Sequence, residues 1–128
     1  MEYLLDTHSF LWFINGDHQL SEKAKNAIVN TEAAKYISIV SLWEIAIKLR
    51  LQKLTLDMEF TDLRQQVVGN GFEILPITFE HTIILTSLEL HHRDPFDRMI
   101  IAQALREGLT VIGKDENFHK YNGLKLLW

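Results

Sequence analysis

The chain has 128 residues, a length that suits one compact domain with a sizeable core and is short for two. It contains no cysteine, which excludes disulfides, thiolate zinc sites and cysteine nucleophiles. Its net charge of −4 disfavours a plain basic groove for nucleic acid, but it is compatible with divalent cations that bridge carboxylates to phosphate.

Short apolar runs alternate along the chain with stretches of helical spacing. The first half is expected to contain a strand, a helix, a strand and two helices, in that order, at Tyr3–Asp6, Ser21–Val29, Tyr36–Val40, Leu42–Leu54 and Phe60–Val68. The second half is expected to contain a strand, two helices and two strands, at Phe72–Leu75, Glu80–Leu90, Pro95–Glu107, Thr110–Gly113 and Lys125–Leu127. This alternation predicts a three-layer α/β/α fold, with a central five-stranded and mostly parallel sheet.

Membrane and secretory signals are missing from the amino-acid pattern. No basic segment precedes an apolar stretch near the first residue, and no apolar run is long enough to cross a bilayer. We therefore expect a cytoplasmic protein without a membrane partner.

Four acids fall where a parallel α/β sheet carries its ligands, beyond the carboxyl ends of the strands. Asp6 ends the first predicted strand, and Glu44 lies in the first turn of the helix after the second. Asp97 lies in the first turn of the helix that leads to the fourth strand, and Asp115 follows that strand. Carboxylates gathered on one rim repel one another unless cations neutralise them, and hard cations prefer oxygen ligands. The pattern predicts a Mg²⁺ or Mn²⁺ site.

Each acid also has a structural interpretation. The segment Ser41-Leu-Trp-Glu44 fits a capping box at a helix start, and Glu44 can also pair with Lys48 one turn later. For Glu44 the structural and functional interpretations weigh equally. Asp6 also suits a turn or cap after its strand, and Asp115 also suits an ordinary loop acid in a polar stretch.

The acids at residues 94 and 97 receive different interpretations. Asp94 precedes Pro95, which is typical of an N-cap followed by proline at the first helical position. Asp97 instead falls in the apolar stripe of its helix, beside Ile100 and Ala104. A carboxylate in that place is costly unless something pairs with it, so a functional role is favoured.

Other functional classes fit less well. His91 and His92 are adjacent and diverge on a helix, and no zinc-binding spacing supports the six histidines. A haloacid-dehalogenase-like phosphatase needs an acid at His8, and a receiver domain needs one at Leu75-Pro76. A non-catalytic RNA- or protein-binding module, whose acids only cap helices, stays an alternative.

Apolar residues exceed what one core face requires at Leu42–Leu54 and at Leu11-Trp12-Phe13. This surplus fits a partner groove or a self-association surface, and a well-buried helix explains it equally well.

Three segments resemble motifs of the PIN-domain family, within it the VapC-type toxins of bacterial toxin–antitoxin pairs. They are Tyr-Leu-Leu-Asp6-Thr-His, Ser-Leu-Trp-Glu44-Ile-Ala-Ile-Lys and His-His-Arg-Asp94-Pro-Phe-Asp97-Arg-Met-Ile-Ile-Ala-Gln-Ala. The resemblance runs nearly end to end. It implies a single PIN-like domain over residues 1–128 and a Mg²⁺- or Mn²⁺-dependent endoribonuclease that hydrolyses RNA. It further implies a cognate antitoxin that binds and silences the enzyme, and a homodimer.

The resemblance also assigns residues. Asp6, Glu44 and Asp97 match the core acids of the family, Asp115 matches its more variable fourth acid, and Asp94 and Arg98 match positions that flank the third. The family often has Thr or Ser two residues before the fourth acid, and this chain has Gly113 there. Any help that a hydroxyl gives in ordering the site is therefore missing.

In the expected mechanism, Asp6 and Asp97 hold a divalent ion, and Glu44 and Asp115 complete its shell or order its water. The ion makes a water acidic enough to attack phosphorus in line, and a second ion roughly 3.5–4 Å away can stabilise the leaving oxygen. Neither the RNA substrate nor the number of ions follows from the residues.

Overall fold

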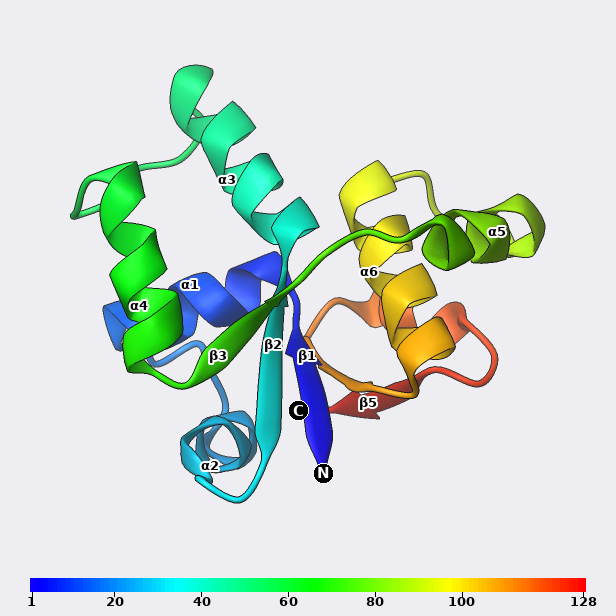
Figure 1. The fold of residues 1–128 in the computed structure, drawn as a ribbon, viewed down its shortest axis with the longest axis horizontal. Coiled ribbons are helices and arrows are strands. Elements are labelled where there is room, and N and C mark those ends of the chain that lie inside the picture. Colours follow the sequence, from blue (N-terminus) through cyan, green and yellow to red (C-terminus); the bar gives the residue numbers. More distant parts are fainter.

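The computed structural model of the protein describes residues 1–128 and contains one five-stranded sheet (Figure 1). Its strands are β1 (Glu2–Leu5), β2 (Ala34–Ser38), β3 (Phe72–Leu75), β4 (Thr110–Ile112) and β5 (Lys125–Leu127). Their order in the sheet is β3-β2-β1-β4-β5, and every neighbouring pair is parallel. The expected parallel α/β sheet is confirmed.

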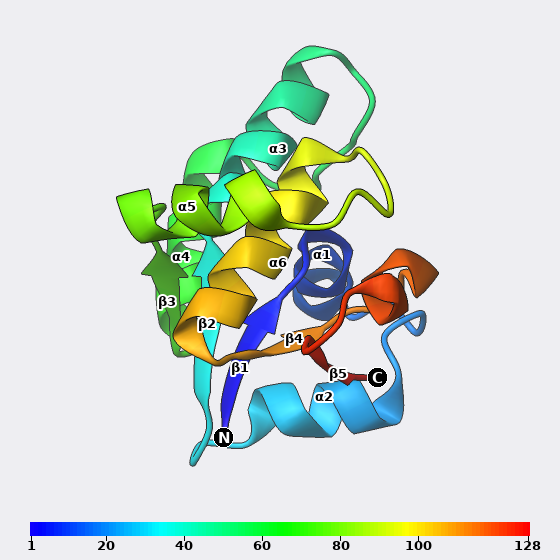
Figure 2. The same cartoon turned by 90° about the vertical axis from the view of Figure 1, so that its right-hand side faces the viewer.

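Six α-helices and two short 3₁₀-helices connect the strands. The helices are α1 (Thr7–Asn15), α2 (Glu22–Val29), α3 (Ile39–Arg50), η1 (Phe60–Asp62), α4 (Leu63–Gly69), α5 (Phe79–Ser87), α6 (Pro95–Glu107) and η2 (Glu116–Lys120). Figure 2 shows α5 lying beside α6, well apart from α2. None of these helices has the length and apolar character needed to cross a membrane.

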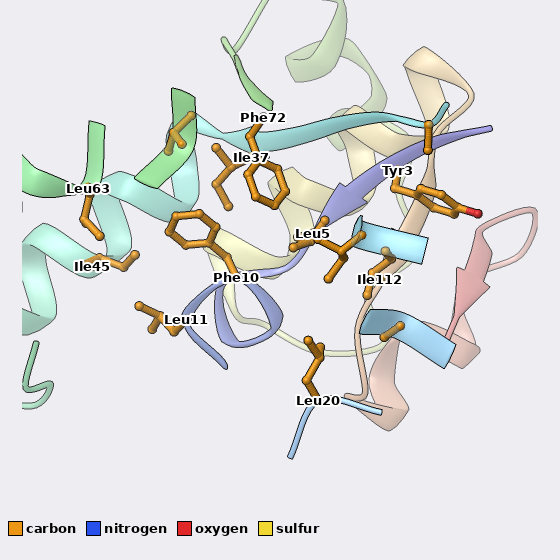
Figure 3. Packing of buried hydrophobic residues seen from close by; sticks show 14 residues of the cluster. Tyr3, Leu5, Phe10, Leu11, Leu20, Ile37, Ile45, Leu63, Phe72 and Ile112 are labelled. Carbon is orange, nitrogen blue, oxygen red and sulfur yellow. The ribbon is translucent and has the colours of Figure 1, made fainter. Parts of the chain in front are cut away.

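The two faces of the sheet bury separate apolar clusters, because successive side chains of a strand point in opposite directions. Leu5 joins Phe10, Ile37 and Phe72 on one face, which α1, α2, α3 and α4 cover (Figure 3). Leu4 points to the other face and packs with residues of α6 and of the segment after β4. This division confirms the three-layer α/β/α architecture.

The predicted bounds of α6 are confirmed, because local residues determine both of its ends. Asp94 caps the first turn and Pro95 occupies its start, where a missing N–H costs no hydrogen bond. Gly108 ends the helix with φ 69°, a left-handed conformation that glycine adopts without steric cost.

Several other predicted bounds were wrong. The strand β2 ends at Ser38, two residues early, and α3 begins at Ile39 rather than Leu42 because Ser38 caps it through the Val40 N–H. The expected helix 60–68 divides into η1 and α4, and α5 ends at Ser87 instead of Leu90. The helices α1 and η2 had no predicted bounds.

Candidate active site

The carboxylate of Asp6 is buried where β1 passes into α1. The Asp6 N–H donates to the carbonyl of Ile112 on β4, at 3.0 Å, which ties this residue to the centre of the sheet. Its Oδ1 accepts the N–H of Ser9 at 2.8 Å and so caps α1. Burial raises the pKa of Asp6 and the charge of Asp115 adds to the rise, whereas Ser9 and His8 oppose it. Only one oxygen is used by the cap, which leaves Oδ2 available to a further partner.

Glu44 lies in the second turn of α3, not in the first turn as expected. Because α3 begins at Ile39, Ser41 sits inside the helix, and the capping-box interpretation was wrong. Oε1 of Glu44 accepts the Thr7 hydroxyl and Oε2 accepts the Lys48 ammonium, both at 2.6 Å. The expected pairing with Lys48 is confirmed, and the buried charge of Glu44 is thereby compensated.

Asp97 lies in the first turn of α6 with a half-buried side chain and no Lys or Arg partner. Burial, followed by the charges of Asp94, Asp6, Asp115 and Glu44, raises the pKa of Asp97 to about 7. Like charges act in this way only over short distances, so these acids face a common region. In Figure 1 α6 begins on the side of the sheet where β2 passes into α3.

Asp94 and Asp115 both serve as helix caps. Oδ1 of Asp94 accepts the N–H groups of Phe96 and Asp97 at 2.9 and 3.0 Å, as expected for an N-cap. Asp115 is exposed, and its Oδ1 accepts the Asn117 N–H at 2.8 Å at the start of η2. Its charge nevertheless contributes to the raised pKa of Asp6 and of Asp97.

The donor chemistry of this site fits a divalent cation. Carboxylate oxygens are the ligands that Mg²⁺ and Mn²⁺ prefer, and an added positive charge would relieve the repulsion that raises the pKa of Asp97. No three His, Asp or Glu side chains already lie in an arrangement that would hold an ion. Mg²⁺ usually keeps several waters and is bound through only one or two carboxylates, so two of these acids would be enough to hold it.

Gly113 leaves room for the carboxylate of Asp6. A Cβ atom at this position would lie 3.0 Å from Asp6 Oδ2 and 2.7 Å from a ring carbon of Phe118, a buried side chain of η2. The Cβ of a serine or threonine would therefore collide with the Phe118 ring and crowd the carboxylate of Asp6. The departure from the family pattern at Gly113 therefore has a steric reason.

Gly113→Ala is expected to lower the free energy of unfolding by about 1–3 kcal/mol, because an added methyl overpacks this contact. Denaturant unfolding measures the loss. Gly69→Ala is the matched control, since a Cβ at Gly69 meets nothing within 4 Å and the position is helical. Equal stability of Gly113→Ala and the wild type would contradict the steric explanation.

Sequence reasoning missed the polar side chains that hold these acids. Thr7 directly follows Asp6 and binds Glu44, and His92 Nε2 lies 3.5 Å from Asp97 Oδ2. Both interactions join distant elements, so no local spacing indicates them. His91 and His92 lie in the loop before α6, not on a helix, and no metal group forms around them.

An apolar groove of about 640 Å³ lies beside the site. It runs between α3 and the η1–α4 segment, and Ile39, Leu42, Trp43, Phe60 and Ile74 supply most of its apolar lining. Trp43 is 57% exposed and contacts Phe96 edge to face, with 5.3 Å between the ring centroids. The surplus apolar residues of α3 thus line a groove as well as the core.

Comparison with solved structures shows a shared fold. VapBC2 from Rickettsia felis, bound to a DNA fragment from its promoter, is 17% identical with a TM-score of 0.75, and the match covers 99% of this chain and 98% of that chain. DNA-bound VapBC from Salmonella typhimurium is 17% identical with a TM-score of 0.72, covering 99% and 97%. VapBC-1 from nontypeable Haemophilus influenzae is 14% identical with a TM-score of 0.71, covering 99% and 97%.

No curated protein sequence matches the chain. The sequence pattern of the PIN domain, in contrast, matches residues 3–124, which include β2, β3, β4 and all of β1 except Glu2, and which end directly before β5. The match includes the four acids at the carboxyl edge of the sheet. The chain therefore belongs to the PIN domain family.

Proposed function

We propose that residues 1–128 form a single-domain, metal-dependent endoribonuclease, the toxin of a type II toxin–antitoxin pair. The observation that carries the proposal is the state of Asp97. Its carboxylate is half-buried, has no Lys or Arg partner, and has a pKa that is raised in part by the charges of four other acids. A protein gains no stability from such a charge, so the arrangement favours a cationic ligand. Membership of the PIN domain family makes a nuclease the best-supported class.

Two acids are available to hold the ion directly, Asp6 through its free Oδ2 and Asp97. Glu44 already binds Thr7 and Lys48 through both oxygens, which suits it to orienting water or the lysine rather than direct coordination. Asp115, exposed at the rim, can complete the shell. A bound Mg²⁺ or Mn²⁺ ion would supply an activated water and charge stabilisation at the scissile phosphodiester.

The proposed partners are RNA, a cognate antitoxin and a second copy of the chain. The three solved structures described above are VapBC proteins, and another similar structure is a toxin–antitoxin complex from Klebsiella pneumoniae. The groove beside α3 is an apolar surface that supports a protein partner. On α5 the exposed side chains of Phe79 and Ile83 offer a surface for a homodimer.

A non-catalytic binding module is the second candidate, favoured by one observation. Asp6, Asp94 and Asp115 all accept backbone N–H groups at helix starts, as structural caps do. Such a module would bind RNA or protein without changing it. The raised pKa of Asp97 argues for the nuclease, because a carboxylate kept only as a cap gains from staying ionised.

The test is a cleavage assay with the purified chain, end-labelled RNA and the DNA of the same sequence. Cleavage of RNA in Mg²⁺ or Mn²⁺, its loss in EDTA and its return with added metal would support the proposal. RNA that the protein binds but does not cut would support the binding module. Cleavage that continues unchanged in EDTA would overturn the metal-dependent mechanism.

A further inference from the structure

A chain of polar contacts reaches Asp97 from the C-terminal part of the molecule. Nη1 of Arg98 donates to the hydroxyl of Tyr121 at 3.0 Å, and that hydroxyl lies 2.7 Å from Nδ1 of His92. On the other side of the imidazole ring, Nε2 lies 3.5 Å from Oδ2 of Asp97. Tyr121 is 4% exposed and the His92 side chain 12% exposed, so little water competes for these contacts.

The donors and acceptors in this chain determine where the protons lie. A guanidinium only donates, so the oxygen of Tyr121 accepts from Arg98. The single hydroxyl proton of buried Tyr121 then needs an acceptor, and His92 Nδ1 is the one within reach. A neutral imidazole that accepts at Nδ1 carries its proton on Nε2. The N–H of His92 therefore faces Asp97.

This Nε2 atom is buried and makes no hydrogen bond. Its distance of 3.5 Å from Asp97 is a few tenths of an ångström longer than the usual N–H···O range, which ends at about 3.2 Å. An unsatisfied buried donor is costly, and a small movement of Asp97 would satisfy it. A proton on Nε2 also prevents this nitrogen from acting as a metal ligand, because ligating imidazoles use a free lone pair.

Arg98, the first residue in this series of polar contacts, is held firmly in place. The guanidinium of Arg98 also donates to the carbonyls of Glu89 and Leu88, at 2.7 and 3.1 Å, which hold it against the loop before α6. Arg98 is thus engaged with the protein and is not free to contact phosphate. Because Arg98 is fixed, Tyr121 and the imidazole that it contacts are fixed as well, and only the Nε2 edge of the ring is turned toward Asp97.

We propose that His92 is a positioning residue for Asp97, kept in its Nε2–H form by Arg98 and Tyr121. The inference rests on the proposed function, in which Asp97 is a reactive carboxylate of the site. Histidine–carboxylate pairs around metal sites fix the orientation of the ligating group, and their loss typically lowers metal affinity or activity 10–100-fold. The donated hydrogen bond would set the direction of Oδ2 and leave Oδ1 for the ion.

The first test needs no activity. Long-range ¹H–¹⁵N spectra of the labelled protein at about pH 8, above the ordinary histidine pKa of about 6.5, identify the protonated nitrogen of His92. We expect a slowly exchanging proton on Nε2 that shifts in Asp97→Asn, and a loss of this fixed form in Tyr121→Phe. A proton on Nδ1 of the wild-type ring would overturn the inference.

The second test compares two neutral replacements of His92. The amide nitrogen of His92→Gln reaches the place of Nε2, whereas that of His92→Asn reaches only the place of Nδ1. The Mn²⁺ concentration that gives half of the thermal stabilisation is expected to rise about 10-fold in His92→Asn and to stay within about 3-fold in His92→Gln. Wild-type Mn²⁺ affinity in His92→Asn would contradict a positioning role.

Cleavage rates separate the two proposals. Loss of cleavage in Asp97→Asn, together with a lower rate but an unchanged KM for RNA in His92→Asn, supports both. If Asp97→Asn is inactive and His92→Asn cleaves like the wild type, only the positioning role fails. If Asp97→Asn cleaves like the wild type, the proposed function itself fails, whatever His92 does.

Discussion

Asp6→Asn and Asp97→Asn are each expected to lower the rate of RNA cleavage at least about 100-fold, because even residues that only support metal ligands are worth 10–100-fold. The amide that replaces each carboxylate keeps its size but removes the charge that would hold the ion. In Asp6→Asn the side-chain oxygen can still accept the Ser9 N–H, so the cap of α1 is preserved. The measurement is the initial rate of cleavage at saturating Mn²⁺ and RNA.

Asp57→Asn is the matched control, since Asp57 is exposed and lies in the loop between α3 and η1. It should cleave RNA at the wild-type rate. All three variants should give the circular dichroism spectrum of the folded protein, which separates a loss of chemistry from a loss of structure. Undiminished cleavage by both Asp6→Asn and Asp97→Asn would end the nuclease proposal.

The sheet and α6 could be predicted because their signals are local. Each strand is a short apolar run bounded by polar or turn residues, and α6 carries its own signals in Asp94, Pro95 and Gly108. The rule that ligands bind at the carboxyl ends of parallel strands then selected the acids on that edge. The neighbouring acids add to the rise in the pKa of Asp97, as expected for carboxylates that repel one another, and the role of these acids as metal ligands stays a prediction.

The start of α3 could not be predicted because two serines compete for the cap. Ile39 and Val40 are β-branched and favour a strand, which made Ser41 the better candidate. In the structure Ser38 takes the cap, and its hydroxyl also donates to Gln103 of α6 at 2.6 Å. A contact 65 residues away thus supports the boundary, and no local pattern contains it.

The partners of the acids could not be predicted either, because they too lie far away in the sequence. Thr7 and Glu44 are 37 residues apart, and His92 meets Tyr121 across 29 residues. Such pairs exist only once the helices are packed on the sheet. The sequence therefore predicts which carboxylates gather, whereas only the structure shows that Glu44 is already compensated and that Asp97 is not.

Asp97→Asn is also expected to make the metal-free protein more stable. The pKa of Asp97 rises from 3.8 to about 7 on folding, so between these values the folded state binds the proton that the unfolded state releases. Stability from this group is complete below about pH 4 and is lost as the pH rises through 7. At about pH 8 the loss is at most about 4 kcal/mol, at 1.4 kcal/mol for each pKa unit, and about 2 kcal/mol once partial solvation is allowed for.

Denaturant unfolding in EDTA at several pH values measures this effect. Asp97→Asn should exceed the wild type at about pH 8 and lose that advantage near pH 4, where the wild-type carboxyl is protonated in both states. Asp94→Asn should gain less, because it keeps a capping side chain and removes only one of the charges that raise the pKa of Asp97. Equal stabilities at all pH values would show that Asp97 is solvated like a surface acid.

Metal should reverse the order of stability. A ligand that binds only the folded state raises the unfolding midpoint, so Mn²⁺ is expected to stabilise the wild type and to leave Asp97→Asn nearly unchanged. An acid kept only to cap a helix would show the opposite balance, since removing it weakens the helix with or without metal. If Asp97 destabilises the metal-free protein and stabilises the metal-bound one, its role is to bind the cation. The loss of folding free energy without metal is then the cost of that role.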